Sequence, residues 1–281
     1  MKCLNLGCGS RCHPEFVNVD LASSNPKVLT CDITKDIPFA EETFDVVYHS
    51  HLLEHINKEK APHFLNECYR VLKVHGIIRV VVPDLEQIAR MYLTVLDLVL
   101  QEKKESEANY DWMLLELYDQ TVRAQPGGAM LEYLKQNPIP NEAFVYQRAG
   151  GEARRIIRAL REAASNGKSR PGAMRNRFGS MYSIAGRLRE KLLRLLLNES
   201  DYRALETARF RACGEIHQWM YDRYSLARLL RQAGFQNLRA MNANESQIPG
   251  WTEYQLDTES DGTIYKPDSL FMEATKVWKL A

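Results

Sequence analysis

The chain has 281 residues, of which 45% are hydrophobic and 26% charged, and its formal net charge is +1. These values are typical of a soluble globular protein and allow one large domain or a domain with a sizeable insertion. A nearly neutral molecule is not built as a whole to bind nucleic acid, so no such partner is expected. No apolar stretch approaches the roughly 18 residues of a membrane span, and the N-terminus lacks a cleavable signal pattern.

The six cysteines include no C-x-x-C pair, which suits a reducing, cytoplasmic location. Cys8, Cys12 and His13 are close enough in sequence to suggest a metal site. However, Cys8 lies inside a glycine turn, and a structural zinc site needs four ligands. We therefore expect no metal.

Four short apolar runs dominate the first 50 residues, and three of them end in a glycine turn or an acid. The first leads into Gly7 and Gly9, the second ends at Asp20 and the third is followed by Asp32. The fourth run, 44–48, leads into the sequence HSHLLEH. Glycine lets the backbone approach a ligand closely, and such strand ends indicate a nucleoside-binding crevice on a parallel sheet.

Two other nucleotide sites do not fit this pattern. A dinucleotide fingerprint needs a third Gly or Ala where Cys12 stands, and its acid follows about 20 residues later, whereas Asp20 comes sooner. A phosphate-binding P-loop needs Gly-Lys-Ser/Thr, which is absent.

Together, the G-x-G turn, the two spaced acids and the run FDVVYHSHLLEH resemble class I S-adenosylmethionine (SAM) methyltransferases. The resemblance implies an α/β fold: a Rossmann-like, doubly wound, mostly parallel sheet of about seven strands, the last of them antiparallel. It implies SAM as cofactor, with Asp20 on the ribose and Asp32 and the backbone of Ile33 on adenine. The implied cofactor-binding residues are Asn5, Gly7, Gly9, Asp20, Leu21, Asp32, Ile33 and Ser50.

The sequence departs from that family twice. Asn5 stands where an acid is usual, so any contact there with the methionine amine is through an amide or is lost. The connection from Gly9 to Phe16 has room for only about one or two helical turns, and Pro14 suits the first turn of such a helix.

Periodicity predicts the remaining elements of the core: helices over 60–72, 85–100 and 225–233, and strands over 77–82, 238–241 and 270–277. Ser225 is predicted to cap the last of these helices, and Gly234 to end it. Residues 101–212 contain helical patterns broken by Gly and Pro, with no strand pattern. We expect a helical insertion there, forming a lid over the ligand edge of a core made of 1–100 and 213–281.

The lid is rich in Arg and Lys between residues 148 and 194. This charge indicates either a solvated helical face or a surface for an anionic acceptor, such as a nucleotide-linked or lipid-linked sugar. Residues 181–197 are basic and amphipathic, so they could contact a membrane surface or pack on the lid itself. The oligomeric state is not indicated.

Methyl transfer from a sulfonium is a direct displacement that requires alignment, exclusion of water and, for a hydroxyl acceptor, removal of a proton. The candidate catalytic residues are His217, Asp84 and His51. His217 is predicted to be the base, because a neutral-range pKa suits that task. We expect His217, Tyr221 and Asp84 to line one pocket beside the SAM methyl group. Asp84 could instead cap the following helix, and His51 could position the ligand.

The segment HQWMYDRYSL and the later run KPDSL resemble methyltransferases of surface-polysaccharide and natural-product gene clusters. The implied substrate-binding residues are Trp219, Tyr221 and Asp222, although the two aromatics could simply form a wall against the lid. We expect methyl transfer to a hydroxyl, or less favourably an amine, of a small or carrier-linked metabolite, with a sugar favoured. A peptide or aromatic acceptor and a catalytically inactive SAM-binding module are the alternatives, and Asn5 favours the latter.

Overall fold

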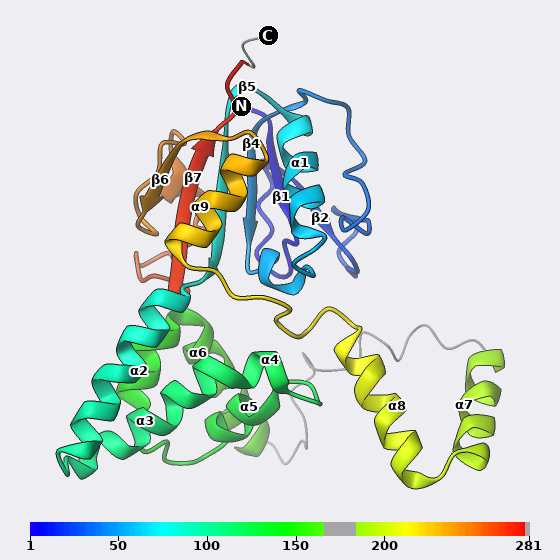
Figure 1. Ribbon diagram of the computed structural model, residues 1–281, viewed down its shortest axis with the longest axis vertical. Coiled ribbons are helices and arrows are strands. Elements are labelled where there is room, and N and C mark those ends of the chain that lie inside the picture. The colour runs from blue at the N-terminus through cyan, green and yellow to red at the C-terminus, as the bar shows by residue number, and fades with distance from the viewer. Residues whose placement is uncertain (166–183, 279–281) are drawn as a thin grey trace.

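The computed structural model describes residues 1–165 and 184–278. Its sheet has seven strands in the order β3-β2-β1-β4-β5-β7-β6, and a helical region lies at the edge where β5 ends (Figure 1). The strands are β1 (Cys3–Leu6), β2 (Phe16–Asp20), β3 (Val28–Thr30), β4 (Phe44–Ser50), β5 (Leu72–Pro83), β6 (Gln236–Met241) and β7 (Ser269–Thr275). Neighbouring strands are parallel, except that β7 is antiparallel to both β5 and β6. The predicted Rossmann-like fold and its antiparallel last strand are confirmed.

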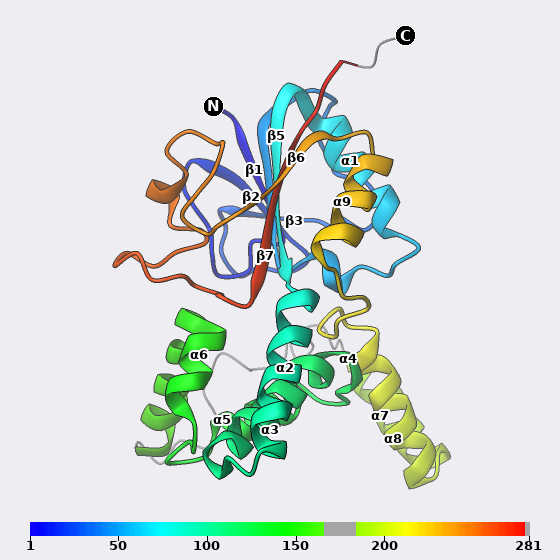
Figure 2. The ribbon, with the colours of Figure 1, turned by 60° about the vertical axis from the view of Figure 1, so that its left-hand side comes forward.

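The two faces of the sheet are covered differently (Figure 2). Helices α1 (Ala61–Val71) and α9 (Arg223–Gln232) pack their apolar sides on one face. The connection between β6 and β7, residues 242–268, covers the other face and contains the short helix η5 (Trp251–Tyr254). Burial on both faces explains why the central strands are almost continuously apolar.

No helix connects β1 to β2, so the short helix expected after Gly9 was wrong. Asn18 instead donates from its amide nitrogen to the carbonyl oxygens of His13 and Phe16, and Asn5 donates to that of Arg11. These side chains take up loop carbonyls that a helix would otherwise satisfy, which is how asparagine competes with helical structure.

A fully buried arginine fastens the 242–268 connection to the sheet. Arg79 of β5 donates from Nε to Asp257 at 2.7 Å and from Nη1 to Glu273 of β7 at 2.7 Å. Tyr48 and Trp251 donate to the same Asp257 carboxylate at 2.6 and 2.9 Å. The network joins two strands and the connection through a single guanidinium.

The helical region comes between β5 and α9 in the chain. Its elements are α2 (Leu85–Leu100), η2 (Lys104–Ser106), α3 (Glu107–Leu114), the π-helical turn η3 (Leu115–Asp119), α4 (Gln120–Val122), α5 (Gly128–Leu134), α6 (Glu142–Ser165), α7 (Ile184–Leu196) and α8 (Glu199–Arg211). Several of these helices share a core that includes Ile88, Trp112, Val145 and Ile157. Ile88 belongs to α2, so α2 packs with this region. The division of the chain at residues 100 and 212 stays a prediction.

Part of the basic insertion, residues 166–183, lies outside the described residues. The expected amphipathic segment 181–197 is therefore described only as α7, beside α8 (Figure 1). Four leucines of α7 are exposed: Leu188, Leu192, Leu195 and Leu196. Its contact with a membrane surface stays a prediction. Among the described helices, none combines the length and apolar character needed to cross a bilayer.

Replacing Arg79 by Met should leave Asp257 and Glu273 buried without their counterion. We expect the free energy of unfolding in urea to fall by about 3–5 kcal/mol. The matched control Arg203→Met breaks a pair with Glu199 whose side chains are 74% and 79% exposed, and should cost less than about 1 kcal/mol. Equal stability of Arg79→Met and the wild type would show that the network does not hold the connection.

Candidate functional site

The glycine turn after β1 is clasped by the acid at the end of β2. Gly7 and Gly9 have φ values of 65° and 53°. The backbone nitrogen of Gly9 donates to Asp20 Oδ2 at 2.7 Å, and that of Ala22 donates to Asp20 Oδ1 at 3.3 Å. The buried Asp20 carboxylate therefore fixes the turn beside which a ligand would lie.

A cavity of about 190 Å³ opens at the carboxyl ends of β1 and β4. Four of the predicted cofactor-binding residues line it: Asn5, Gly7, Gly9 and Ser50. We call this space the turn cavity. His51, which directly follows β4, also lines it.

The other predicted cofactor-binding residues lie outside the lining of the turn cavity. Cys31 donates its backbone N–H to the carbonyl of Asp20, so the ends of β2 and β3 are adjacent. Asp32 accepts hydrogen bonds from the backbone and hydroxyl of Thr34, and these lower its pKa. Leu21 is 55% exposed, whereas the Ile33 side chain is buried in the core.

Sequence reasoning missed the residues that α6 and the β6–β7 connection bring to the turn cavity: Glu152, Arg155, Tyr265 and Lys266. Lys266 Nζ lies 3.0 Å from Glu152 Oε2. α6 is kinked at Gly150, where φ is 55° and a Cβ would lie only 2.6 Å from the carbonyl oxygen of Ile264. The glycine therefore allows the close approach, and the Gly150-Gly151 pair in the sequence was the available signal.

The charges in the turn cavity include a carboxylate and cations. Burial alone would raise the pKa of Glu152, but Lys266, together with His51 and Arg155, outweighs this effect, so the pKa lies below its usual value. Glu152 is therefore ionised at neutral pH.

Asn5 was predicted to bind the cofactor, but its amide is used within the protein. It donates to Arg11 O at 2.9 Å and to Asn18 Oδ1 at 3.0 Å, so it stabilises the loop between β1 and β2.

A second cavity, of about 400 Å³, lies where α2 begins and where the chain leaves α8. We call it the outer cavity. Two of the predicted site residues, His217 and Trp219, line it, together with Thr121 and Arg211 of the helical region. Trp219 is 40% exposed, and the ammonium of Lys58 lies 3.8 Å from its ring centroid.

Asp84 and Tyr221 were expected to share a pocket with His217. They are neighbours, since Leu85 donates its N–H to Tyr221 O at 3.0 Å, but neither lines the outer cavity. Asp84 caps α2 by accepting from the N–H groups of Glu86 and Gln87. Tyr221 is buried, and burial raises its pKa to about 12.

Asp222 caps α9 in a reciprocal arrangement. Its side chain accepts from the backbone of Tyr224 and Ser225, while the Ser225 hydroxyl accepts from the backbone N–H of Asp222. The helix was predicted to be capped by Ser225, which was wrong by three residues, because Ser225 occupies the third helical position of a capping box.

His51 and His217 approach the same carboxylate from the two cavities. His51 Nδ1 lies 3.1 Å from Glu54 Oε1, and its Nε2 lies 2.8 Å from Ser269 Oγ. His55, next to Glu54 in the short helix η1 (Leu53–His55), stacks edge-on with His217 at 4.8 Å between ring centroids. Burial holds the pKa of His51 and of His217 well below the usual value, so both imidazoles are neutral at pH 7.

Asp268, which precedes the His51 partner Ser269, has a raised pKa. Burial, reinforced by Glu116, raises its pKa from 3.8 to about 7, and Oδ1 has no hydrogen-bond partner within 1–165 and 184–278. The folded state therefore holds a proton that the unfolded state releases. Folding stability should fall as the pH rises from about 4 to about 7 and should not fall further above that.

Comparison with known proteins identifies one domain. Residues 4–80 match the family model described as a methyltransferase domain. No curated protein sequence matches the chain. Structural matches include a SAM-dependent methyltransferase from Archaeoglobus fulgidus (13% identity, 98% of this chain and 86% of the other, TM-score 0.38). Another is a possible histamine N-methyltransferase from Thermotoga maritima (12% identity, 98% and 82%, TM-score 0.38). Matches at this level carry no argument about substrate.

The Asp268→Asn variant should lack the pH dependence that the buried carboxyl causes. We compare the unfolding free energy of the variant with that of the wild type at each pH. The difference, variant minus wild type, should be roughly 2–3 kcal/mol more favourable to the variant at pH 8 than at pH 5. Urea denaturation at both pH values measures this difference. The control Asp36→Asn changes a side chain that is 82% exposed and should give the same small effect at both. A gain for Asp268→Asn that is larger at pH 5 would contradict the assignment.

Proposed function

We propose that this protein is a class I SAM-dependent methyltransferase that methylates a hydroxyl of a small or carrier-linked sugar. The match of residues 4–80 to a methyltransferase domain and the seven-stranded sheet support the reaction class. The observation that carries the proposal is that each of the two cavities is lined by a histidine that lies near the buried Glu54. His51 of the turn cavity contacts Glu54 from one side, and His217 of the outer cavity approaches it from the other. A methyl donor and an acceptor in these two spaces would face each other.

In this proposal the turn cavity would hold the methionine part of SAM. Glu152 would face the ammonium and supply the negative charge that Asn5 lacks, while Lys266 and Arg155 would face the carboxylate. Asp20 would hold the ribose, and Asp32 with the backbone of Ile33, at the adjacent end of β3, would hold adenine.

The acceptor occupies the outer cavity. The exposed face of Trp219 suits stacking on a sugar ring, and Arg211 offers a positive charge to a phosphate on a carrier-linked sugar. The same features leave an amine, an aromatic compound or a peptide as other acceptors. Asp84 and Asp222 are left out of this acceptor site, because both carboxylates cap helices.

The chemistry is one displacement. Bound SAM would supply an electrophilic methyl group, which would pass from sulfur to the acceptor oxygen as the S–CH3 bond is exchanged for an O–CH3 bond and S-adenosylhomocysteine (SAH) is released. The hydroxyl proton would pass to His51, which lines the turn cavity and replaces His217 as the base in this proposal. Burial lowers the pKa of His51, and Glu54, 3.1 Å from His51 Nδ1, is placed to stabilise the imidazolium that forms. Alignment and exclusion of water supply much of the rate.

The proposal is tested by incubating the protein with SAM and measuring SAH released with nucleotide-linked sugars, lipid-linked sugars, catechols and peptides, each against a blank without acceptor. Methyl ethers on a sugar are the expected product, located by mass spectrometry. Turnover with catechols or peptides alone would replace the sugar assignment. SAH formation with none of the four classes would overturn it.

The Glu152→Gln variant should bind SAM and SAH more weakly, because it loses a charge-assisted contact with the methionine ammonium. We expect a loss of affinity of about tenfold or more by calorimetry. Glu162→Gln changes an exposed acid on the same helix and should leave affinity unchanged. Equal affinities of the two variants would remove α6 from the cofactor site.

The His51→Asn variant should lower kcat by about a hundredfold or more while leaving SAH affinity nearly unchanged. Asn is chosen because φ of His51 is 49°, a conformation that Asn tolerates. His63→Asn, at a side chain that is 53% exposed, is the matched control. A His51→Asn enzyme with full kcat would show that His51 neither takes the proton nor aligns the acceptor.

A further inference from the structure

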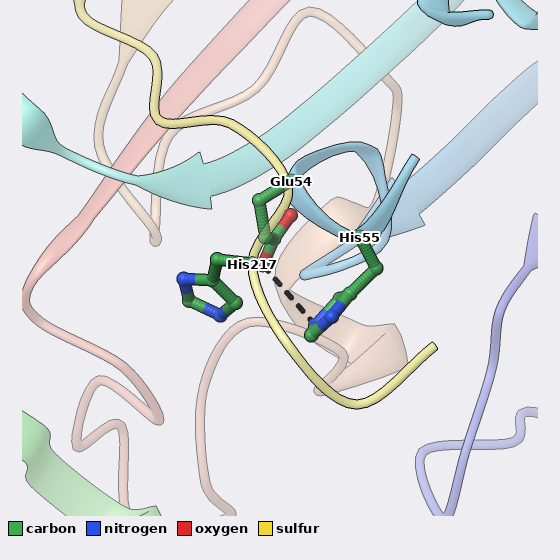
Figure 3. A group of neighbouring side chains, drawn as sticks. All are labelled: Glu54, His55 and His217. Carbon is green, nitrogen blue, oxygen red and sulfur yellow. Dashed lines mark ion pairs between the residues drawn. The ribbon is translucent and has the colours of Figure 1, made fainter. Parts of the chain in front are cut away.

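We propose that Glu54, His55 and His217 form a binding site for one divalent transition-metal ion, with zinc as the best fit. Figure 3 shows the three side chains converging from two segments: Glu54 and His55 from η1, and His217 from the chain that follows α8. One carboxylate oxygen and two imidazole nitrogens are a ligand set that zinc takes in sites that keep a fourth position open.

The spacing of the ligand atoms fits a single ion. One ligand atom from each residue lies within 4.8 Å of the other two, and Glu54 Oε1 is 4.0 Å from His55 Nε2. Two ligands on a tetrahedral zinc are separated by about 3.4 Å at metal–ligand distances near 2.1 Å. Side-chain shifts on the order of 1 Å would therefore bring all three within bonding distance.

Glu54 supplies an independent observation. Its side chain is fully buried, and neither carboxylate oxygen has a hydrogen-bond partner among the described residues. The contact with His51 is close at 3.1 Å but is not aligned as a hydrogen bond. A buried carboxylate without partners is costly, and a cation at this point would offset that cost.

The second imidazole is already oriented for a metal. His55 Nδ1 lies 3.0 Å from the carbonyl oxygen of Ile216, which can only accept, so Nδ1 carries the proton. Nε2 is then left with its lone pair and is the atom that faces Glu54. Metal-binding histidines commonly donate their other nitrogen to a backbone carbonyl in this way.

Backbone bonds hold the two segments together. Gln218 and Trp219 both donate their N–H groups to the carbonyl oxygen of Glu54, at 2.6 and 3.2 Å. His217 lines the outer cavity, so the open coordination position would face the proposed acceptor. The binding site stands on this geometry alone, whereas its role in holding an acceptor oxygen rests on the proposed function.

Zinc binding is measured on the full chain after treatment with a chelator and without SAM, by competition with a chromophoric chelator. We expect one equivalent of zinc, with affinity at least tenfold weaker in Glu54→Gln and in His217→Gln. Cobalt as a probe should give a spectrum of nitrogen and oxygen ligation. Thermal unfolding verifies that each variant is folded. If His217→Gln does not fold, the nearly isosteric Glu54→Gln alone tests the proposal.

Cys12→Ser is the matched control, because Cys12 Sγ lies 3.5 Å from Cys8 Sγ and a thiol pair is the competing zinc site in this chain. Zinc binding retained in Cys12→Ser and lost in Glu54→Gln supports the proposal. No zinc binding, or binding lost only in Cys12→Ser, overturns it. The zinc-binding assay contains no SAM, so its result is independent of methyl transfer. A protein that binds zinc but transfers no methyl group would contradict the proposed function and still support the metal site.

Discussion

The position of the β6–β7 connection depends on one buried guanidinium. Residues 242–268 contain little regular structure, so few backbone hydrogen bonds hold them to the sheet. Arg79 compensates by binding Asp257 within the connection and Glu273 on β7, all three side chains being almost completely buried. The desolvation of such charges is costly unless every donor and acceptor is satisfied, and here Tyr48 and Trp251 complete the arrangement.

The connection that Arg79 holds on one face of the sheet also contributes residues to the turn cavity. The connection carries Tyr265 and Lys266 into the turn cavity, and its backbone at Ile264 receives the kinked α6 at Gly150. The helix α6 is thus held against the connection by a glycine contact and by the Lys266–Glu152 pair. A change in the buried network would therefore alter the turn cavity without changing a residue that lines it.

The parts of the fold that were predictable from sequence are those with local causes. The strands that end at Gly7 and Asp20 were predicted because each pairs an apolar run with a turn residue. The helix expected between β1 and β2 failed, because the side chains of Asn5 and Asn18 satisfy the loop through tertiary contacts. The cap of α9 was misplaced because Ser and Asp compete for that role at a spacing of three residues.

The site was less predictable, since its members are distant in sequence. Glu152 meets Lys266 and Glu54 meets His217 only because α6 and the segment after α8 both return to the sheet edge. The basic character of the insertion was also misleading in part. Arg148, which counted toward that excess, is a buried partner of Glu116 within the helical region and is not a surface charge.

Glu54 is a buried acid that lies near a histidine of each cavity, and its surroundings indicate a role beyond stability. Its backbone carbonyl accepts two N–H groups from the segment that carries His217, while its carboxylate is buried and accepts no hydrogen bond from the part of the chain that the structure describes. A structural residue in that position could be a leucine at no electrostatic cost, so stability alone does not account for the acid. The carboxyl instead lies near two imidazoles, His51 of the turn cavity and His217 of the outer cavity. Burial raises the pKa of this carboxyl, which means that its charged form is costly unless a cation or a proton offsets the charge. Such a cation or proton would lie between the histidines of the two cavities.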